Sequence, residues 1–133
     1  MTRTTNGTKP NPLQEAIRDA SRHVSNAMSL VVFAAKEEVD AAWHQAAVKE
    51  ELAAYLLEAE GKELEAAVHR ISAASCYEDI GDYARAITLL RAALSVKLRP
   101  VYRIKIENQL KDCLKKVRKK PRRSSHKKTA SAP

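Results

Sequence analysis

Residues 74–94, ASCYEDIGDYARAITLLRAAL, contain a tyrosine, a glycine four residues later and an alanine-rich apolar ladder. Tyr83, Ile87 and Leu90 recur at spacings of four and three, the period of an α-helix with one apolar face. Gly81 directly precedes this ladder, a typical position for a turn that ends the preceding helix. The stretch therefore predicts a helix, a tight turn at Gly81 and a second helix.

The same pattern extends over the rest of the chain. Gly61, Gly81 and Pro100 each signal a helix end or a turn, and the segments between them carry helical stripes. The related sequences GKELEAA (61–67) and GDYARAI (81–87) support consecutive antiparallel hairpins. The apolar stripes, in chain order, are Leu13, Ile17, Val24, Met28, Val31; Val39, Trp43, Ala46, Ala53; Leu64, Val68, Ile71, Ser75; Tyr83, Ile87, Leu90, Leu94, Leu98; and Tyr102, Ile106, Leu110, Cys113, Val117.

The N-terminal half begins with a polar arm. Residues 1–10 have no apolar period and are expected to be disordered. Asn11 suits a helix N-cap and Pro12 the first helical position. Because no Gly or Pro occurs from 13 to 60, either one long helix or two helices with a break near 33–38 fit; a compact domain favours two.

The composition is typical of an all-α protein. Of the 133 residues, 44% are hydrophobic, but only 3 are Gly, one is Phe and one is Trp. Much of the apolar fraction is alanine, which brings helices close together but buries little area per residue. We expect about four or five antiparallel helices at 11–118, modest stability, and a disordered basic tail at 119–133.

The two cysteines, Cys76 and Cys113, lack the spacing of a metal site. They predict two reduced thiols in a cytosolic protein; a bridge between neighbouring helices is the alternative. The N-terminus has no apolar signal-peptide core, and the longest apolar run, residues 30–35, is too short to span a bilayer. We therefore expect a cytoplasmic protein, or a nuclear one if the source is eukaryotic.

Residues 67–100, AVHRISAASCYEDIGDYARAITLLRAALSVKLRP, resemble a tetratricopeptide repeat (TPR), a helical hairpin of about 34 residues. Arg70 and Ala73 depart from the family pattern, since large apolar residues are usual at both places. The residues that match the small, aromatic, turn and packing positions are Ala74, Tyr77, Gly81, Ala86, Leu90 and Ala93. The resemblance implies a helical-repeat scaffold for protein interactions.

The family binds peptides on the inner surface of the first helix of each repeat. Lys105 and Gln109 of the terminal helix stand where some members grip a C-terminal carboxylate, but Ile71 and Ser75 replace that clamp in the clear repeat. The binding groove offered by the clear repeat is apolar with an acidic end, which favours an apolar or basic helix as partner. The partner-binding residues implied by the resemblance are Val68, Ile71, Ser75, Glu78 and Asp79.

The segments on either side of this repeat resemble other parts of a TPR array. Residues 41–66 resemble a degenerate preceding repeat, and residues 101–118 the terminal helix that covers such arrays. The helices from about 65 to 118 also resemble a microtubule-interacting and trafficking (MIT) domain, which binds helical peptide motifs. The alternative to partner binding is that Val68 and Ile71 simply pack on the preceding helix.

No pattern predicts a catalytic or cofactor centre. The pairs Asp40–His44 and Glu65–His69 have i,i+4 spacing, which is common on helix surfaces and insufficient for a metal site. No Ser/His or Cys/His arrangement with a third, orienting group can be argued from the sequence, and no Gly-rich phosphate loop occurs. We expect a protein that is not an enzyme and has no metal or cofactor.

Charge is concentrated at the C-terminus. Lys97 to the end holds 14 Lys and Arg and 2 Asp and Glu, a net charge of +12, whereas residues 1–96 carry −4. Such a run attracts polyanions by counterion release. Because no aromatic residues lie between the cations to stack on bases, binding is expected to be independent of base sequence. The predicted polyanion-binding residues are Lys115, Lys116, Arg118, Lys119, Lys120, Arg122, Arg123, Lys127 and Lys128. A nuclear import signal, a lipid contact, an anchor on an acidic protein and a solubilising tail are alternatives.

These observations predict a small non-enzymatic adaptor whose helices hold a protein partner and whose tail contacts nucleic acid or another acidic surface. The alternatives are a sequence-nonspecific nucleic-acid-associated protein that acts through its tail, and an MIT-like module in trafficking. The acidic stretch 36–82 and the basic terminal helix also predict a homo-oligomer or an obligate partner.

Overall fold

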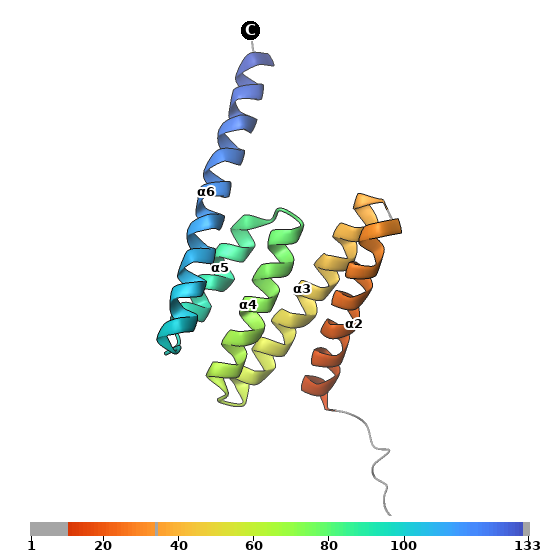
Figure 1. Cartoon of the computed structure of the whole chain (residues 1–133), viewed down its shortest axis with the longest axis vertical. Coiled ribbons are helices and arrows are strands. Elements are labelled where there is room, and N and C mark those ends of the chain that lie inside the picture. The colour runs from red at the N-terminus through yellow and green to blue at the C-terminus, as the bar shows by residue number, and fades with distance from the viewer. Residues whose placement is uncertain (1–10, 34, 132–133) are drawn as a thin grey trace, which may run out of the picture.

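The computed structural model describes the backbone of residues 11–33 and 35–131, and the side chains of residues 11–29 and 35–119. Each helix packs antiparallel to the next, so the helices form a row in chain order (Figure 1). This arrangement confirms the all-α hairpin fold, while the arm 1–10 lies outside the described residues. The part described has no strand and contains five helices: α2 (Pro12–Phe33), α3 (Lys36–Ala59), α4 (Glu63–Asp79), α5 (Tyr83–Leu94) and α6 (Pro100–Ser131).

The first hairpin consists of two helices rather than one long helix. The Asn11 side-chain oxygen accepts a hydrogen bond from the Gln14 backbone N–H at 2.7 Å, which confirms the predicted N-cap. The break falls between Phe33 and Lys36, as favoured from the sequence. At the start of α3 the Glu38 carboxylate accepts from the Ala35 backbone N–H at 3.3 Å, half of a capping box.

The two glycine turns have the same geometry. Gly61 and Gly81 have φ angles of 79° and 81°, the left-handed region that glycine adopts without a steric penalty. The N–H of Lys62 bonds to the Leu57 carbonyl, and the N–H of Asp82 bonds to the Tyr77 carbonyl, each at 2.9 Å. These are Schellman closures, so the related sequences at 61–67 and 81–87 encode the same turn. Asp82 also caps α5 by accepting from the Arg85 N–H at 3.2 Å.

Gly81→Val is expected to lower the free energy of unfolding by about 1–3 kcal/mol, because a β-branched residue is strained at positive φ. Thermal unfolding measures the loss. Gly81→Asn is the control, since asparagine tolerates the left-handed region better. Equal stability of the valine variant and the parent would contradict a left-handed turn at this position.

Most of the buried residues in the described part of the chain are alanines. Among residues 12–29 of α2, whose side chains the structure describes, Ala16, Ala20 and Ala27 are buried, whereas Met28 of the predicted stripe is 61% exposed. In α4, Leu64 and Val68 are also exposed. The prediction that the large residues mark the buried face is therefore wrong at Met28, Leu64 and Val68, whereas Leu13, Val24 and Ile71 are partly buried and pack against the core. Small side chains let two backbones approach, and Met28, Leu64 and Val68 lie outside the contact.

The stripes of α5 and α6 agree better with the predicted packing. Leu94, Leu98, Leu110 and Val117 of the later stripes are partly buried and pack against the same core, as does Trp43 of α3. The packing positions inferred for residues 67–100 are all buried: Ala74, Tyr77, Ala86, Leu90 and Ala93.

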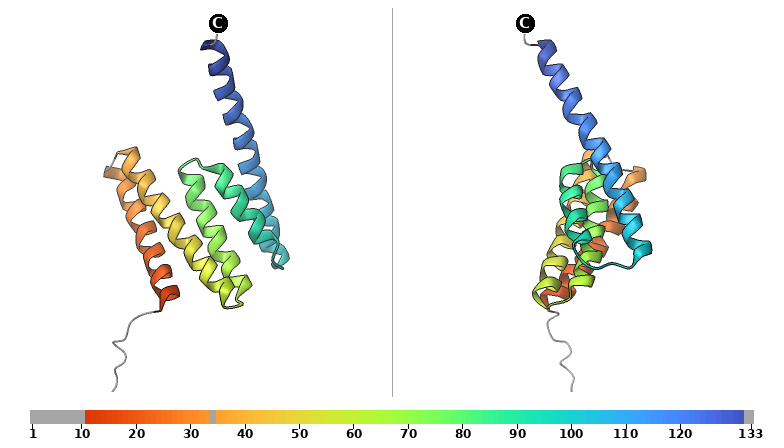
Figure 2. Two further views of the ribbon diagram at one scale, coloured as in Figure 1. Left: turned by 180° about the vertical axis from the view of Figure 1, so that it is seen from behind. Right: turned by 90° about the vertical axis from the view of Figure 1, so that its left-hand side faces the viewer.

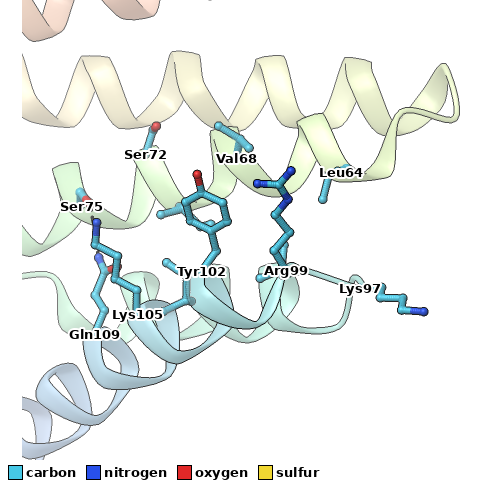
Figure 3. A pocket seen from close by; sticks show the side chains of 12 residues that line it. Leu64, Val68, Ser72, Ser75, Lys97, Arg99, Tyr102, Lys105 and Gln109 are labelled. Carbon is cyan, nitrogen blue, oxygen red and sulfur yellow. Dashed lines mark hydrogen bonds between the residues drawn. The ribbon is translucent and has the colours of Figure 1, made fainter.

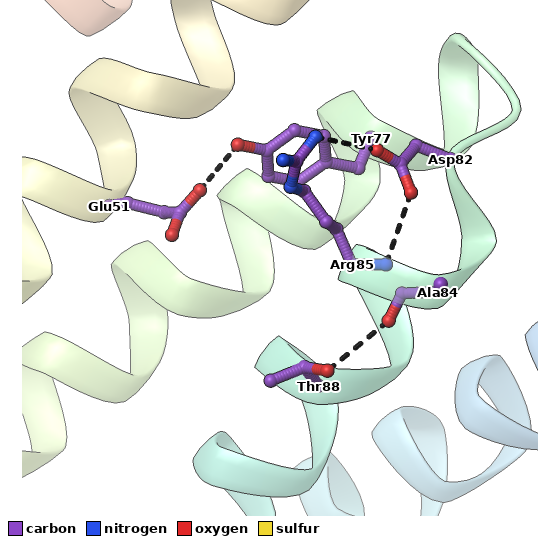
Figure 4. A network of polar contacts seen from close by, with 6 residues as sticks. All are labelled: Glu51, Tyr77, Asp82, Ala84, Arg85 and Thr88. Atoms are coloured by element: carbon purple, nitrogen blue, oxygen red, sulfur yellow. Dashed lines mark hydrogen bonds and ion pairs between the residues drawn. The ribbon is translucent and has the colours of Figure 1, made fainter.

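A polar network joins α3, α4 and α5 around the buried Tyr77 (Figure 4). The Tyr77 hydroxyl donates to the Glu51 carboxylate, and the Arg85 guanidinium lies 5.7 Å from the centre of the tyrosine ring. Arg85 in turn forms an ion pair with Asp82 at 3.0 Å. Because each group has a partner, the network orients the three helices without leaving a free polar atom on Tyr77.

The last helix extends beyond the row. Pro100 is its first residue, where the missing N–H costs no helical hydrogen bond. Its backbone is helical to Ser131, past the boundary at 118 expected from the sequence, and its C-terminal part projects beyond the other helices (Figure 2). The side chains of 120–131 lie outside the described set, and disorder of 119–133 in solution stays a prediction. In the described part of the chain, no helix is long and apolar enough to cross a membrane.

Candidate functional site

A groove of about 820 Å³ lies between α4 and α6 (Figure 3). One wall is formed by α4 and contributes Leu64, Val68, Ile71, Ser72 and Ser75. The other wall is formed by the α5–α6 connection and α6, which contribute Lys97, Leu98, Arg99, Tyr102, Lys105, Ile106 and Gln109.

The floor of the groove is apolar and remains accessible. Leu64, Val68 and Tyr102 expose 55%, 54% and 53% of their surface, although they face a concave site. Ile71 and Ile106 pack against the core below. Exposed apolar side chains gathered in a concavity are typical of a site that binds another molecule.

Three of the five predicted partner-binding residues, Val68, Ile71 and Ser75, line the groove. Glu78 lies at its end, where the Gln109 side-chain amide donates to the Glu78 carboxylate and, at 3.2 Å, to the Ser75 hydroxyl. Asp79 is exposed at the end of α4 and does not line the groove. Desolvation, followed by the charge of Glu78, raises the pKa of Asp79 above its usual value.

The second wall changes the charge of the site. The interpretation of an apolar groove with an acidic end holds only for α4, because Lys97, Arg99 and Lys105 bring three cations to the opposite side. Sequence reasoning noted Lys105 and Gln109 but missed Lys97, Arg99 and Tyr102. A signal was available: Tyr102, Lys105 and Gln109 are spaced three and four residues apart and so share one face of α6.

Arg103 holds the cationic end of the groove in place. Its guanidinium donates to the carbonyl oxygen of Leu94, the last residue of α5, at 2.7 Å and to that of Val96, just beyond the helix, at 3.3 Å. It also lies 3.6 Å from the Glu107 carboxylate. These contacts tie α6 to the end of α5, so the connection that carries Lys97 and Arg99 has a defined path.

The remaining reactive groups are engaged or buried. Both cysteines are free and buried, so two thiols rather than a bridge are confirmed. Burial, followed by the charge of Glu50, raises the pKa of Cys76 to about 12; burial, followed by Glu78, raises the pKa of Cys113 to about 11. Thiols with raised pKa values are poor nucleophiles and poor metal ligands at neutral pH.

Members of the two pairs with i,i+4 spacing have other partners. His69 pairs with Glu50 of α3 at 2.6 Å instead of Glu65, and Asp40 pairs with Lys36 at 2.5 Å instead of His44. Among the described residues, no group of three or more His, Cys, Asp or Glu is arranged to hold a metal ion.

The basic block is described in part. Lys115, Lys116, Arg118 and Lys119 are exposed along α6, and the Lys116 ammonium lies 5.3 Å from the centre of the Tyr83 ring. Lys120, Arg122, Arg123, Lys127 and Lys128 lie outside the described side chains.

Comparison with protein families, with curated proteins and with solved structures finds no match to this chain.

Proposed function

We propose that this protein is a non-enzymatic protein-interaction adaptor, TPR-like in its helical hairpins, that binds a segment of a partner protein in the groove between α4 and α6. The observation that carries the proposal is the set of exposed apolar residues, Leu64, Val68 and Tyr102, gathered in one concave site. A partner would remove this apolar surface from water, which is the main driving force of most protein association. The proposal includes a cytoplasmic location, where Cys76 and Cys113 stay reduced.

The row arrangement supports this function over the MIT-like alternative. A closed bundle of α4, α5 and α6 would fill the space between its first and last helices. Here each helix packs on its chain neighbour, and the space between α4 and α6 is the groove itself.

Peptide display on the intact chain tests the function. We expect selection from a random peptide library to yield binders whose affinity falls at least about tenfold when Val68 is replaced by Glu, because a carboxylate is then placed on the apolar floor. Val48→Glu on α3 is the matched control, since Val48 is a similarly exposed valine outside the groove. Fluorescence anisotropy measures both variants; binders indifferent to Val68→Glu would contradict groove binding.

The proposed adaptor also contacts polyanions through its basic segment. Lys115, Lys116, Arg118 and Lys119 are exposed in the middle of α6, the helix whose C-terminal part projects beyond the row (Figure 2). A cationic surface set apart from the groove can hold a polyanion while the groove holds a protein segment.

Removal of residues 118–133 is expected to abolish most oligonucleotide binding. For the intact chain we expect affinity that falls steeply with salt and differs little between unrelated sequences, because counterion release supplies the free energy. Titration of labelled DNA and RNA at several salt concentrations measures the slope. Retention of binding by the variant that ends at Val117 would assign the contact to the helical domain instead.

A further inference from the structure

The charge and shape of the groove define the kind of segment that fits it. Among the described lining residues, three are cationic and none is acidic: Lys97, Arg99 and Lys105. All three are exposed, and Figure 3 shows Arg99 and Lys105 on either side of Tyr102, with Lys97 at the end of the groove. An apolar floor with cations along one wall is complementary to an apolar stripe that has carboxylates beside it.

The spacing of the lining residues indicates the conformation of that segment. Leu64, Val68, Ile71 and Ser75 follow one another at four, three and four residues, so the α4 wall repeats about every 5.4 Å. The side chains on one face of another helix repeat at the same distance, whereas those of an extended strand repeat about every 6.6 Å. Over three repeats the strand falls out of register by about 4 Å, which favours a helix lying along the groove.

The chain's own termini do not suit the groove. Residues 1–10 contain Arg3 and Lys9 and no acidic residue. Residues 120–133 contain Lys and Arg but no Asp or Glu. Either segment would bring positive charge to a cationic site. Neither segment is therefore a complementary occupant of the groove.

From these observations we propose that the groove binds an acidic amphipathic helix of a partner protein. Its apolar stripe, at positions i, i+4, i+7 and i+11, packs on Leu64, Val68 and Tyr102. Carboxylates flanking that stripe pair with Arg99 and Lys105. This inference rests on the proposed function and specifies its ligand.

The groove also gives the bound helix a direction. Lys97 and Arg99 lie at one end, and the Glu78 carboxylate with Gln109 lies at the other. A helix C-terminus carries partial negative charge and its N-terminus partial positive charge. The partner helix therefore lies with its C-terminus at Lys97 and Arg99, antiparallel to α4.

The test uses the full chain and a labelled synthetic helix that has Leu at i, i+4, i+7 and i+11 and Glu on both flanks. Three comparison peptides replace every Glu by Lys, scramble the order of the same residues, or place Pro at the centre. Fluorescence anisotropy at fixed salt is expected to show that the Glu helix binds at least about tenfold more tightly than each of them. Equal or tighter binding of the Lys, scrambled or Pro peptide would overturn the inference.

Charge reversal tests the named residues. The variant Lys97→Glu, Arg99→Glu, Lys105→Glu is expected to lose at least about tenfold in affinity for the Glu helix and to prefer the Lys helix. Recovered binding of the Lys helix shows that this variant is folded, and the single change Lys105→Gln, expected to weaken binding by a smaller factor, gives a second measure. The control variant Lys111→Glu, Lys115→Glu, Lys119→Glu has the same net charge, and its exposed residues lie on α6 outside the groove. A loss confined to the control variant would assign acidic-peptide binding to the basic block and overturn the inference.

Two further outcomes separate this inference from the function on which it rests. Displayed peptides that lose affinity on Val68→Glu but contain no acidic residues would leave the adaptor function standing and overturn the acidic helix. Sedimentation of the free chain as a dimer that the groove charge reversal dissociates would assign the groove to a second copy, and would also overturn the acidic helix.

Discussion

Leu90→Ala is expected to lower the free energy of unfolding by about 2–5 kcal/mol. Leu90 has no exposed surface and lies in α5 within the core cluster that also contains Tyr77 and Ile87. Truncation removes apolar contacts and leaves a cavity, because the neighbouring helix backbones hold one another in place. An alanine-rich core buries little area per residue, so this loss is a large fraction of the total stability of such a domain.

Chemical denaturation measured by circular dichroism gives the change. Leu64→Ala is the matched control, because Leu64 is 55% exposed in the groove and is expected to change stability by less than about 1 kcal/mol. If Leu90→Ala and Leu64→Ala were equally stable, the α5 face that contains Leu90 could not be the buried one.

Ala86→Leu is expected to lower the free energy of unfolding by about 1–3 kcal/mol, or to prevent folding where no neighbour can shift. Ala86 has no exposed surface and belongs to the same core cluster as Ala74 and Tyr77. Three added carbon atoms at a contact this close force neighbouring side chains from their rotamers or push helices apart.

The control for overpacking is Ala84→Leu, because Ala84 is an exposed alanine of the same helix with the same backbone conformation. Its stability is expected to stay within about 0.5 kcal/mol of the parent. A stable Ala86→Leu protein would show that α5 does not approach its neighbours through Ala86, and would contradict the packing inferred from residues 67–100.

The exposed residues of the groove are distinct from those that form the core, although Ile71 and Ile106 belong to both the groove and the core. Val68 and Tyr102 are exposed, whereas the buried side of α4 is formed by Ala73, Ala74 and Tyr77. Changes at Val68 therefore act mainly on binding, and changes at Ala74 or Leu90 mainly on folding. This separation makes the groove variants informative about a partner.

The sequence by itself determined the helices and their turns. Asn11, Gly61, Gly81 and Pro100 act through local backbone geometry and capping, which depend on a few neighbouring residues. It also determined which small and large residues close to Gly81 are buried, among them Tyr77, Ala86 and Leu90. The break between Phe33 and Lys36 was left open, since no Gly or Pro marks it.

Only the tertiary structure decided which large side chains of α2 and α4 are exposed and where the groove lies. Alanine fits a contact between helices and a solvated face equally well, so the pattern of large residues pointed to Met28 and Leu64, which are exposed. The groove joins Val68 to Tyr102 and Lys105, residues more than thirty positions apart, and its charge comes from the wall that the repeat does not contain. Such a site depends on how α4 and α6 are placed by the intervening α5, and no local interaction in the sequence determines that placement.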